Sequence, residues 1–248
     1  MNSVVYAMWL RQIKRYWRSK ARMVGTLGQP ILFLIALGFG LGAVFQKAGQ
    51  GNYIEFLAPG IVAMSILFTA MFNGIEVIWD RQFGFLKETL VAPVSRFKIM
   101  LGKTLGGATV AFLQGIVVLL ISLAIGFSIS NLIGIPLALV FMFLIAFLFT
   151  AFGTAIASHL NDMNAFPLII NFIIMPLFFL SGALFPVNDL PSGLNFVIRI
   201  NPLSYGVDGV RGALSTSAFG LGLDFVVMLG GIIIITFLGS YLFSKIEV

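Results

Sequence analysis

Cysteine is absent from the 248 residues of the chain, and histidine occurs only once, as His159. The chain can therefore form no disulfide, no cysteine nucleophile and no zinc site that needs several cysteines or histidines. We interpret His159 as a polar residue at the end of a helix. The segment Gly102-Lys103-Thr104 ends like a phosphate-binding loop, but Phe97 stands where that motif needs its first glycine. We expect no catalytic residue, metal or cofactor in this chain.

Charged residues are also scarce. They make up 10% of the chain, whereas about a quarter is usual in soluble globular proteins. Hydrophobic residues make up 59%, and the mean hydropathy is +1.06. This composition is typical of an integral membrane protein. The net charge of +6 then indicates a membrane face rich in Lys and Arg rather than a nucleic-acid partner.

Six apolar stretches are long enough to cross a lipid bilayer, since about 20 helical residues span a hydrocarbon core of about 30 Å. We predict these spans at 24–45, 54–79, 104–128, 135–158, 165–185 and 222–244. Transmembrane β-strands would be only about 9–11 residues long and would alternate in polarity. The sequence therefore predicts an all-α integral membrane protein, a single domain over 1–248 with its six-helix part at 24–244.

The Lys and Arg residues are distributed unevenly along the chain. Residues 1–23 hold six of them and residues 80–103 hold five, whereas the predicted turns at 46–53 and 129–134 hold one and none. Cytoplasmic segments are enriched in Lys and Arg. We therefore expect both crowded segments, and both termini, in the cytoplasm, and we expect the chain to be a multi-pass protein of the inner (plasma) membrane.

The first 23 residues predict an amphipathic helix. At 100° per residue its apolar face is formed by Val5, Trp9, Ile13, Tyr16 and Trp17, and its basic face by Arg11, Lys14, Arg15, Arg18 and Arg22, with Lys20 as the exception. Such a helix is expected to lie in the membrane interface, on anionic lipid. A basic tail without fixed structure is the alternative.

The predicted cytoplasmic segment 80–96 combines apolar and charged residues. Its centre, 85–92, is long enough for two helical turns, with Gly84 before it and Pro93 after it as helix-ending residues. The segment is too short to fold alone, so we expect it to lie against a partner surface. The alternative is that it rests on lipid headgroups.

A second informative segment, 186–221, is rich in Gly, Pro, Asn and Ser. Its apolar stretches are too short to cross the membrane. We interpret them as broken helices that re-enter the membrane from the outer side, with Asn201-Pro202 as the corner. A surface loop is the alternative.

Residues 180–211 carry a distinctive pattern, Leu-Ser-Gly-x-x-Phe-Pro, then Leu-Pro, then Asn-Pro-Leu-Ser-Tyr-x-x-Asp-x-x-Arg. In this pattern, and in its order of elements over essentially the whole chain, the sequence resembles the permease subunits of type-2 ABC exporters, a family that includes daunorubicin-resistance-like drug pumps and polysaccharide and lipid exporters. The positions that carry the re-entrant motif are Ser181, Gly182, Phe185, Pro186, Asn201, Pro202, Tyr205, Asp208 and Arg211.

The resemblance implies a homodimer of permeases bound to two ABC ATPase subunits, which hold the ATP and Mg. It implies outward transport of an amphipathic drug, lipid or glycan-type substrate by alternating access. The segment 81–96 resembles the family's ATPase-coupling region, and the residues assigned to coupling are Phe83, Gly84, Leu86, Lys87, Glu88, Leu90, Pro93 and Arg96. The rival function is a nucleotide-independent secondary transporter or channel.

Polar side chains inside the predicted spans are candidates for a substrate path. Asn73, Gln114 and Asn171 carry amides, which in hydrocarbon can find partners only on another helix or in a wet cavity. We predict that they line the path, and bonding between helices is the alternative. Glu76 and Asp224 lie near opposite ends of their spans, where we expect water to reach both.

Overall fold

The computed structural model describes residues 3–48, 51–91, 94–160, 165–187 and 190–245, and these residues form helices and connecting turns, with no strand among them. The helices are α1 (Ser3–Arg18), α2 (Lys20–Lys47), α3 (Tyr53–Gln82), α4 (Phe85–Val91), α5 (Arg96–Ile125), the 3-10 turn η1 (Leu132–Gly134), α6 (Ile135–His159), α7 (Ala165–Ile169), the π-helix η2 (Ile170–Ile174), α8 (Met175–Phe179), α9 (Ser192–Ile200), α10 (Pro202–Leu214) and α11 (Leu221–Ser244). The predicted all-α class is confirmed for this part of the chain.

Five of the described helices are long and apolar enough to cross a membrane, namely α2, α3, α5, η1 with α6, and α11. The predicted fifth span, 165–185, is different. It contains the apolar helical run Ala165–Phe179, which at about 1.5 Å per residue is only about 22 Å long. The structure thus has five membrane-length helices and one shorter helical passage, and the count of six spans stays a prediction.

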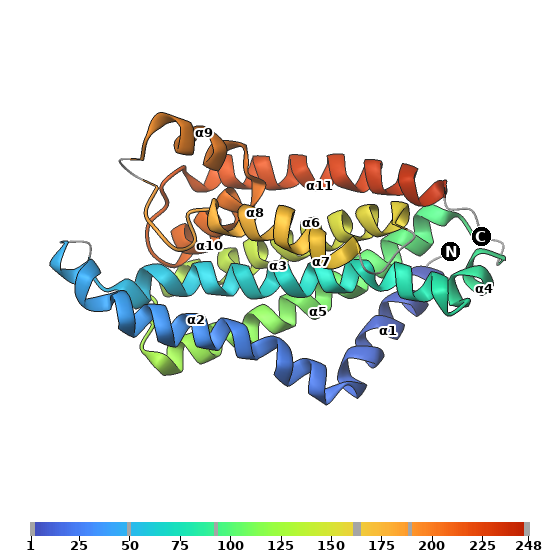
Figure 1. Cartoon of the computed structure of the whole chain (residues 1–248), viewed down its shortest axis with the longest axis horizontal. Coiled ribbons are helices and arrows are strands. Elements are labelled where there is room, and N and C mark those ends of the chain that lie inside the picture. Colours follow the sequence, from blue (N-terminus) through green and yellow to red (C-terminus); the bar gives the residue numbers. More distant parts are fainter. Residues whose placement is uncertain (1–2, 49–50, 92–93, 161–164, 188–189, 246–248) are drawn as a thin grey trace.

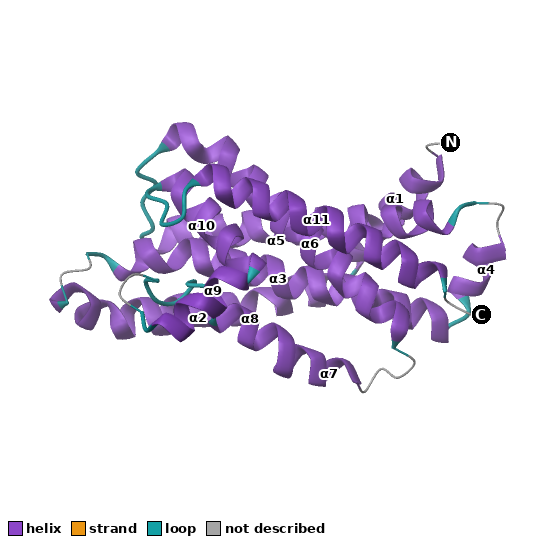
Figure 2. Ribbon diagram, turned by 90° about the horizontal axis from the view of Figure 1, so that it is seen from above, coloured by secondary structure: helices purple, strands orange, loops and turns teal. Residues whose placement is uncertain are grey.

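The shorter passage is irregular for a reason visible in its sequence. Pro176 has no backbone N–H, and its ring crowds the carbonyl of the preceding turn. The helix adapts with the π-helical stretch η2, in which the Met175 N–H bonds to the carbonyl of Ile170. The passage contacts α3 through the ring pairs Phe72–Phe166 and Phe68–Phe178, and Figure 2 shows α7 at the edge of the bundle.

The helices run along one axis, with α3 in the middle of the bundle (Figure 1). The start of α1, the end of α11 and the short helix α4 lie together, and we call this the α4 end. At the opposite end, the α9 end, lie α9, α10, the start of α11, the end of α2 and the start of α3.

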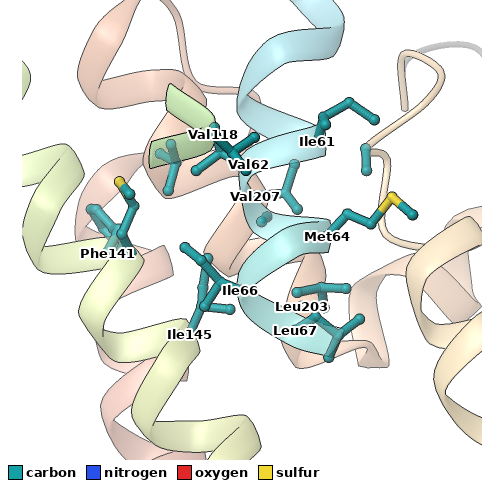
Figure 3. Close-up of a cluster of buried hydrophobic side chains, with 14 of the residues drawn as sticks. Ile61, Val62, Met64, Ile66, Leu67, Val118, Phe141, Ile145, Leu203 and Val207 are labelled. Carbon is teal, nitrogen blue, oxygen red and sulfur yellow. The ribbon is translucent and has the colours of Figure 1, made fainter. Parts of the chain in front are cut away.

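The core is built around α3, which is buried along most of its length. Its inward side chains meet those of α6 and α10, and Figure 3 shows Ile66 facing Ile145 and Leu67 beside Leu203. At one point the two central helices touch through backbone, because a Cβ added to Gly74 would lie 2.6 Å from the carbonyl carbon of Gly153. Small residues allow this close approach of helices.

The N-terminal helix lies against protein where the sequence predicted lipid. Two glycines of α5 admit the backbone of α1, since a Cβ on Gly102 would lie 3.0 Å from the Val5 carbonyl oxygen and one on Gly106 would lie 2.7 Å from the Cβ of Gln12. The indole of Trp9 donates to Thr109 at 3.0 Å. The amphipathic helix is present, but only part of its aromatic face, such as the exposed Trp17, is left for lipid.

Candidate coupling and transport site

The α4 end contains the residues predicted for coupling. Gly84, with a positive φ of 77°, ends α3 and allows the chain to turn directly into α4. From this turn Phe83 projects with 79% of its surface exposed, whereas Leu86 is fully buried, and Glu88 is exposed. At the start of α5, Arg96 donates to the carbonyl of Ser244 at the end of α11. The side chains of Lys87 and Leu90, and the whole of Pro93, lie outside the described residues.

A buried carboxylate, Asp80, lies at the centre of this end. Arg11 of α1 binds it with two hydrogen bonds of 2.9 and 3.1 Å, and Lys103 of α5 forms an ion pair with it from the other side. The side chains of Asp80 and Lys103 are only 4% and 3% exposed. A charge buried this deeply is tolerated because it is paired. Asp80 therefore joins α1, α3 and α5.

A second carboxylate, Glu76, lies one helical turn away on α3. It pairs with Arg22 at 2.5 Å and with Arg15 at 3.5 Å. Arg22 also donates to the Asn73 side chain at 2.7 Å, and the Asn73 amide donates to the carbonyl of Gly107 on α5 at 3.1 Å. We call the set Arg11, Arg15, Arg22, Asn73, Glu76, Asp80 and Lys103 the base network.

Among the described side chains, Arg11 connects the base network to α4. The guanidinium of Arg11 lies 3.6 Å from the ring centre of Phe85, the first residue of α4. Cation–π contacts at this distance are attractive. Arg81 adds a further link, because it donates to the carbonyls of Ser158 and Leu160 at the end of α6. Phe85 thus connects α4 to α1, and Arg11 connects α1 to Asp80 of α3.

A pocket of about 370 Å³ opens beside the base network, between the α1–α2 bend, α3 and α7. Arg15, Arg22 and Glu76 supply its charge, and Phe72, Trp79 and Phe166 supply aromatic walls. The two halves of this lining suit a molecule that has both a polar and an apolar part.

The three amides predicted for a substrate path are not brought together. Asn73 has partners on two other helices, as described. Gln114 is 1% exposed and accepts a hydrogen bond from the Tyr16 hydroxyl of α1. Burial raises the pKa of Tyr16 above its usual value, with Arg22 opposing the shift, so this phenol stays protonated and acts as the donor. Asn171 is exposed, on the π-helical stretch η2.

At the α9 end, the predicted corner is formed by Asn201, which lies between α9 and α10. Its side-chain oxygen accepts from the N–H of Leu203 at 3.0 Å and so caps α10. Its amide group donates to the carbonyls of Leu177 and Leu180 at 2.7 and 2.9 Å. Pro202 fills the first position of α10, where its missing N–H costs nothing. One residue thereby holds α8 and α10 together.

Arg211 makes a comparable connection further along α10. It donates to the carbonyls of Phe56 and Gly182 at 3.3 and 3.0 Å, and its guanidinium lies 4.0 Å from the centre of the Phe56 ring. Burial lowers the pKa of Arg211 to about 10, against the opposing effect of Asp208, and the group stays charged at neutral pH. Gly182 adopts a φ of +71°, which a turn at this point requires of it.

The remaining motif residues are also engaged with backbone. Ser181 donates to the carbonyl of Phe178 and the Tyr205 hydroxyl to that of Arg199. Phe185 and Pro186 are partly buried, and Pro186 lines a pocket of about 240 Å³ together with Arg211. The residue pattern that distinguished the sequence thus builds the turns of the α9 end.

Sequence reasoning missed the ion pairs of the base network. It assigned the cations of the N-terminal helix to lipid, whereas Arg11 and Arg15 bind carboxylates of α3. A signal was available, since Asp80 and Glu76 lie four residues apart and so share one helix face. Their partners, 54 to 69 residues away in Arg22 and Arg11, could not be deduced from that spacing.

Comparison with known proteins shows which family the chain belongs to. Residues 3–215 match the family of ABC-2 type transporters. The chain belongs to this family. It is 30% identical over 209 residues to the transport permease ycf38 of Cyanophora paradoxa, a match that covers 82% of this chain and 71% of that protein.

Two further relatives are nodulation proteins J. That of Rhizobium leguminosarum bv. trifolii is 30% identical over 208 residues, covering 83% of this chain and 79% of the relative. That of Sinorhizobium fredii is 28% identical over 211 residues, with coverage of 84% and 80%. Membership of the ABC-2 type family, together with five membrane-length helices, identifies the chain as a multi-pass membrane transport permease.

Proposed function

We propose that the chain is the membrane-spanning subunit of an ATP-driven ABC exporter that moves an amphipathic drug, lipid or glycan-type substrate outward by alternating access. Two copies would assemble with two separate ATPase subunits, which hold ATP and Mg and carry out its hydrolysis. Six crossings, both termini in the cytoplasm and location in the inner (plasma) membrane belong to the same proposal.

The observation that carries the proposal is the connection of α4 to the base network. Phe83 in the turn before α4 and Glu88 of α4 are exposed to a partner, and Phe85 of α4 contacts Arg11. Arg11 binds Asp80, which binds Lys103. A partner that pushes on α4 could thereby shift α1, α3 and α5, and such a shift is what coupling to distant ATP binding requires.

Two substitutions in this segment separate binding of the ATPase from transmission. Phe83→Ala should weaken association with the ATPase, because Phe83 is exposed. Phe85→Ala should leave association intact but reduce transport per ATP hydrolysed. Phe237→Ala, an exposed aromatic of α11, is the control. Co-purification measures association with the ATPase, and ATP hydrolysis and transport in proteoliposomes together measure coupling. Normal coupling in Phe85→Ala would contradict the proposed transmission through Phe85 and Arg11.

The orientation is supported by charge. All but three of the 15 Lys and Arg residues lie in α1, in α4 or in the adjoining ends of α2, α3, α5 and α11, the exceptions being Lys47, Arg199 and Arg211. Cysteines introduced at Ser95 and Ser244 should be protected from an impermeant thiol reagent applied outside intact cells. A cysteine at Ser192 should react. Labelling of the cysteine at position 95, which replaces Ser95, would contradict the proposed orientation.

Two separate measurements test the dimer and the substrate path. The mass of the detergent-purified complex should correspond to two copies of this chain, and a transporting monomer would contradict the dimer. Asn171 is free of the intramolecular packing that holds Asn73 and Gln114, so it stays the candidate for the path. Asn171→Leu should preserve assembly and change which substrates stimulate the ATPase, whereas loss of assembly would assign Asn171 to the dimer contact.

A further inference from the structure

A buried carboxyl group at the α9 end has no role in the contacts described so far. Asp224 lies in the first turn of α11 and is 0% exposed, although the sequence suggested that water reaches it. That expectation was wrong, because α10 packs against the start of α11. Neither carboxylate oxygen receives a hydrogen bond from any donor in the described part of the chain. An ionised carboxylate left in this state is very costly.

Its acidic neighbour, Asp208 of α10, is in the opposite condition. Asp208 accepts from the Ser217 hydroxyl at 2.7 Å and from the backbone N–H groups of Ala218 and Phe219 at 2.8 to 3.0 Å. These O–H and N–H donors satisfy the Asp208 oxygens as hydrogen-bond acceptors. Asp208 thereby binds the chain five residues before Asp224, and α10 packs against α11.

No ion pair with Asp224 forms in the described part of the chain. In α6 the segment 135–158 contains no titratable residue, and neither does the part of α5 beyond Gln114. Arg211 of α10 is directed to the carbonyls of Phe56 and Gly182. Glu55, another carboxyl group among the described residues of this end, accepts a hydrogen bond from Ser128. Two ionised carboxylates side by side in this setting would repel each other.

We propose that Asp224 is protonated and donates its O–H to Asp208, so that one bound proton joins the start of α11 to α10. If the junction between the two helices opens, water reaches Asp224, the proton leaves to solvent, and two carboxylates repel each other. The closed junction is therefore favoured at low pH and loses stability as the pH rises. This inference does not depend on the proposed export function, because the site lies at the opposite end from α4.

Infrared spectroscopy of the purified protein in detergent tests the proton directly. At neutral pH the wild type should show the carbonyl stretch of a protonated carboxylic acid. The band should be lost in Asp224→Asn, which keeps the shape of the side chain, and retained in the matched control Glu55→Gln. Wild type without the band, or an Asp224→Asn variant that keeps it, would overturn the proposal.

The pH dependence of the wild type tests the same proton even if a variant is poorly produced. The acid band of the wild type should disappear as the pH is raised, and the midpoint of thermal denaturation should fall over the same range. In Asp224→Asn that pH-dependent fall should be reduced, while Glu55→Gln should behave as wild type. If sodium at constant ionic strength instead stabilises wild type but not Asp224→Asn, and no acid band is seen, the site holds a cation and the proposal fails.

Discussion

The two ends of the molecule are held together by different chemistry. At the α4 end, helices are joined by charged side chains that meet one another, as in Arg11–Asp80–Lys103. At the α9 end, polar side chains bind backbone groups instead, as Asn201 does with Leu177 and Leu180. The first arrangement can exchange partners when helices shift, whereas the second fixes the path of one particular turn.

The members of the base network also differ in how much of their side chains is exposed. The arginines of the base network keep about a third of their side-chain surface exposed, 28% for Arg22 and 34% for Arg15, while their carboxylate partners are buried. If the ion pair breaks, water can solvate the partly exposed arginine, but it cannot reach the buried carboxylate. Four predictions follow this contrast, from the largest effect to the smallest.

Asp80→Asn should have the largest effect, because it leaves the buried Lys103 without its counter-charge. Removing one partner of a buried ion pair costs about 3–5 kcal/mol. We expect a large fall in the thermal denaturation midpoint of the protein in detergent. The double variant Asp80→Asn with Lys103→Met removes both charges and should recover most of the loss. If it does not, Asp80 acts mainly through Arg11.

Asn201→Ala should destabilise the α9 end by about 2 kcal/mol, since it removes a helix cap and leaves two carbonyls without a donor. Asn201→Ser is the matched control, because its hydroxyl keeps a capping oxygen and the variant loses the amide donor without adding a charge. Its loss should be smaller in a denaturation assay. Equal losses would show that the cap contributes little.

Tyr16→Phe isolates the contact between α1 and α5 at Gln114. A typical hydrogen bond contributes about 1 kcal/mol, and the ring packing is unchanged by the substitution. The expected result is a slight destabilisation, together with faster proteolysis of the N-terminal helix. Unchanged protection of that helix would indicate that the glycines of α5 hold α1 without this bond.

Arg15→Gln should have the smallest effect, below about 1 kcal/mol, as is usual for partly exposed ion pairs. Glu76 keeps its closer partner Arg22 in this variant. High salt should reduce even this effect, since exposed charges are screened. A loss as large as that of Asp80→Asn would contradict the distinction drawn between buried and exposed members of the base network.

Much of the fold could be predicted from the sequence, because it is encoded locally. Hydropathy identified the long helices, Gly84 the start of α4, and Asn201-Pro202 the corner between α9 and α10. The apolar stretch 165–185 predicted a helical passage, although not that its helical run would stop at Phe179. Each of these features depends on residues close together in the chain.

What could not be predicted depends on contacts between distant segments. The wheel of the first helix was correct in period but gave no indication of its neighbour, which is α5 rather than lipid. Asn73 and Gln114 were correctly singled out as amides in need of partners, yet the partners are side chains of the first 22 residues and the Gly107 carbonyl. Asp224 was expected near water because nothing local shows that α10 folds over it.

The contact between Gly74 and Gly153 has a mechanical consequence. Positions 70, 74 and 78 share one face of α3, and only at 74 is there no Cβ. Sliding α3 along α6 by one turn, about 5.4 Å, would press the side chain of Ala70 or Ile78 into a gap that holds none. The two helices thus have a single permitted register. Any rearrangement of the bundle must therefore move α3 and α6 together, as one unit.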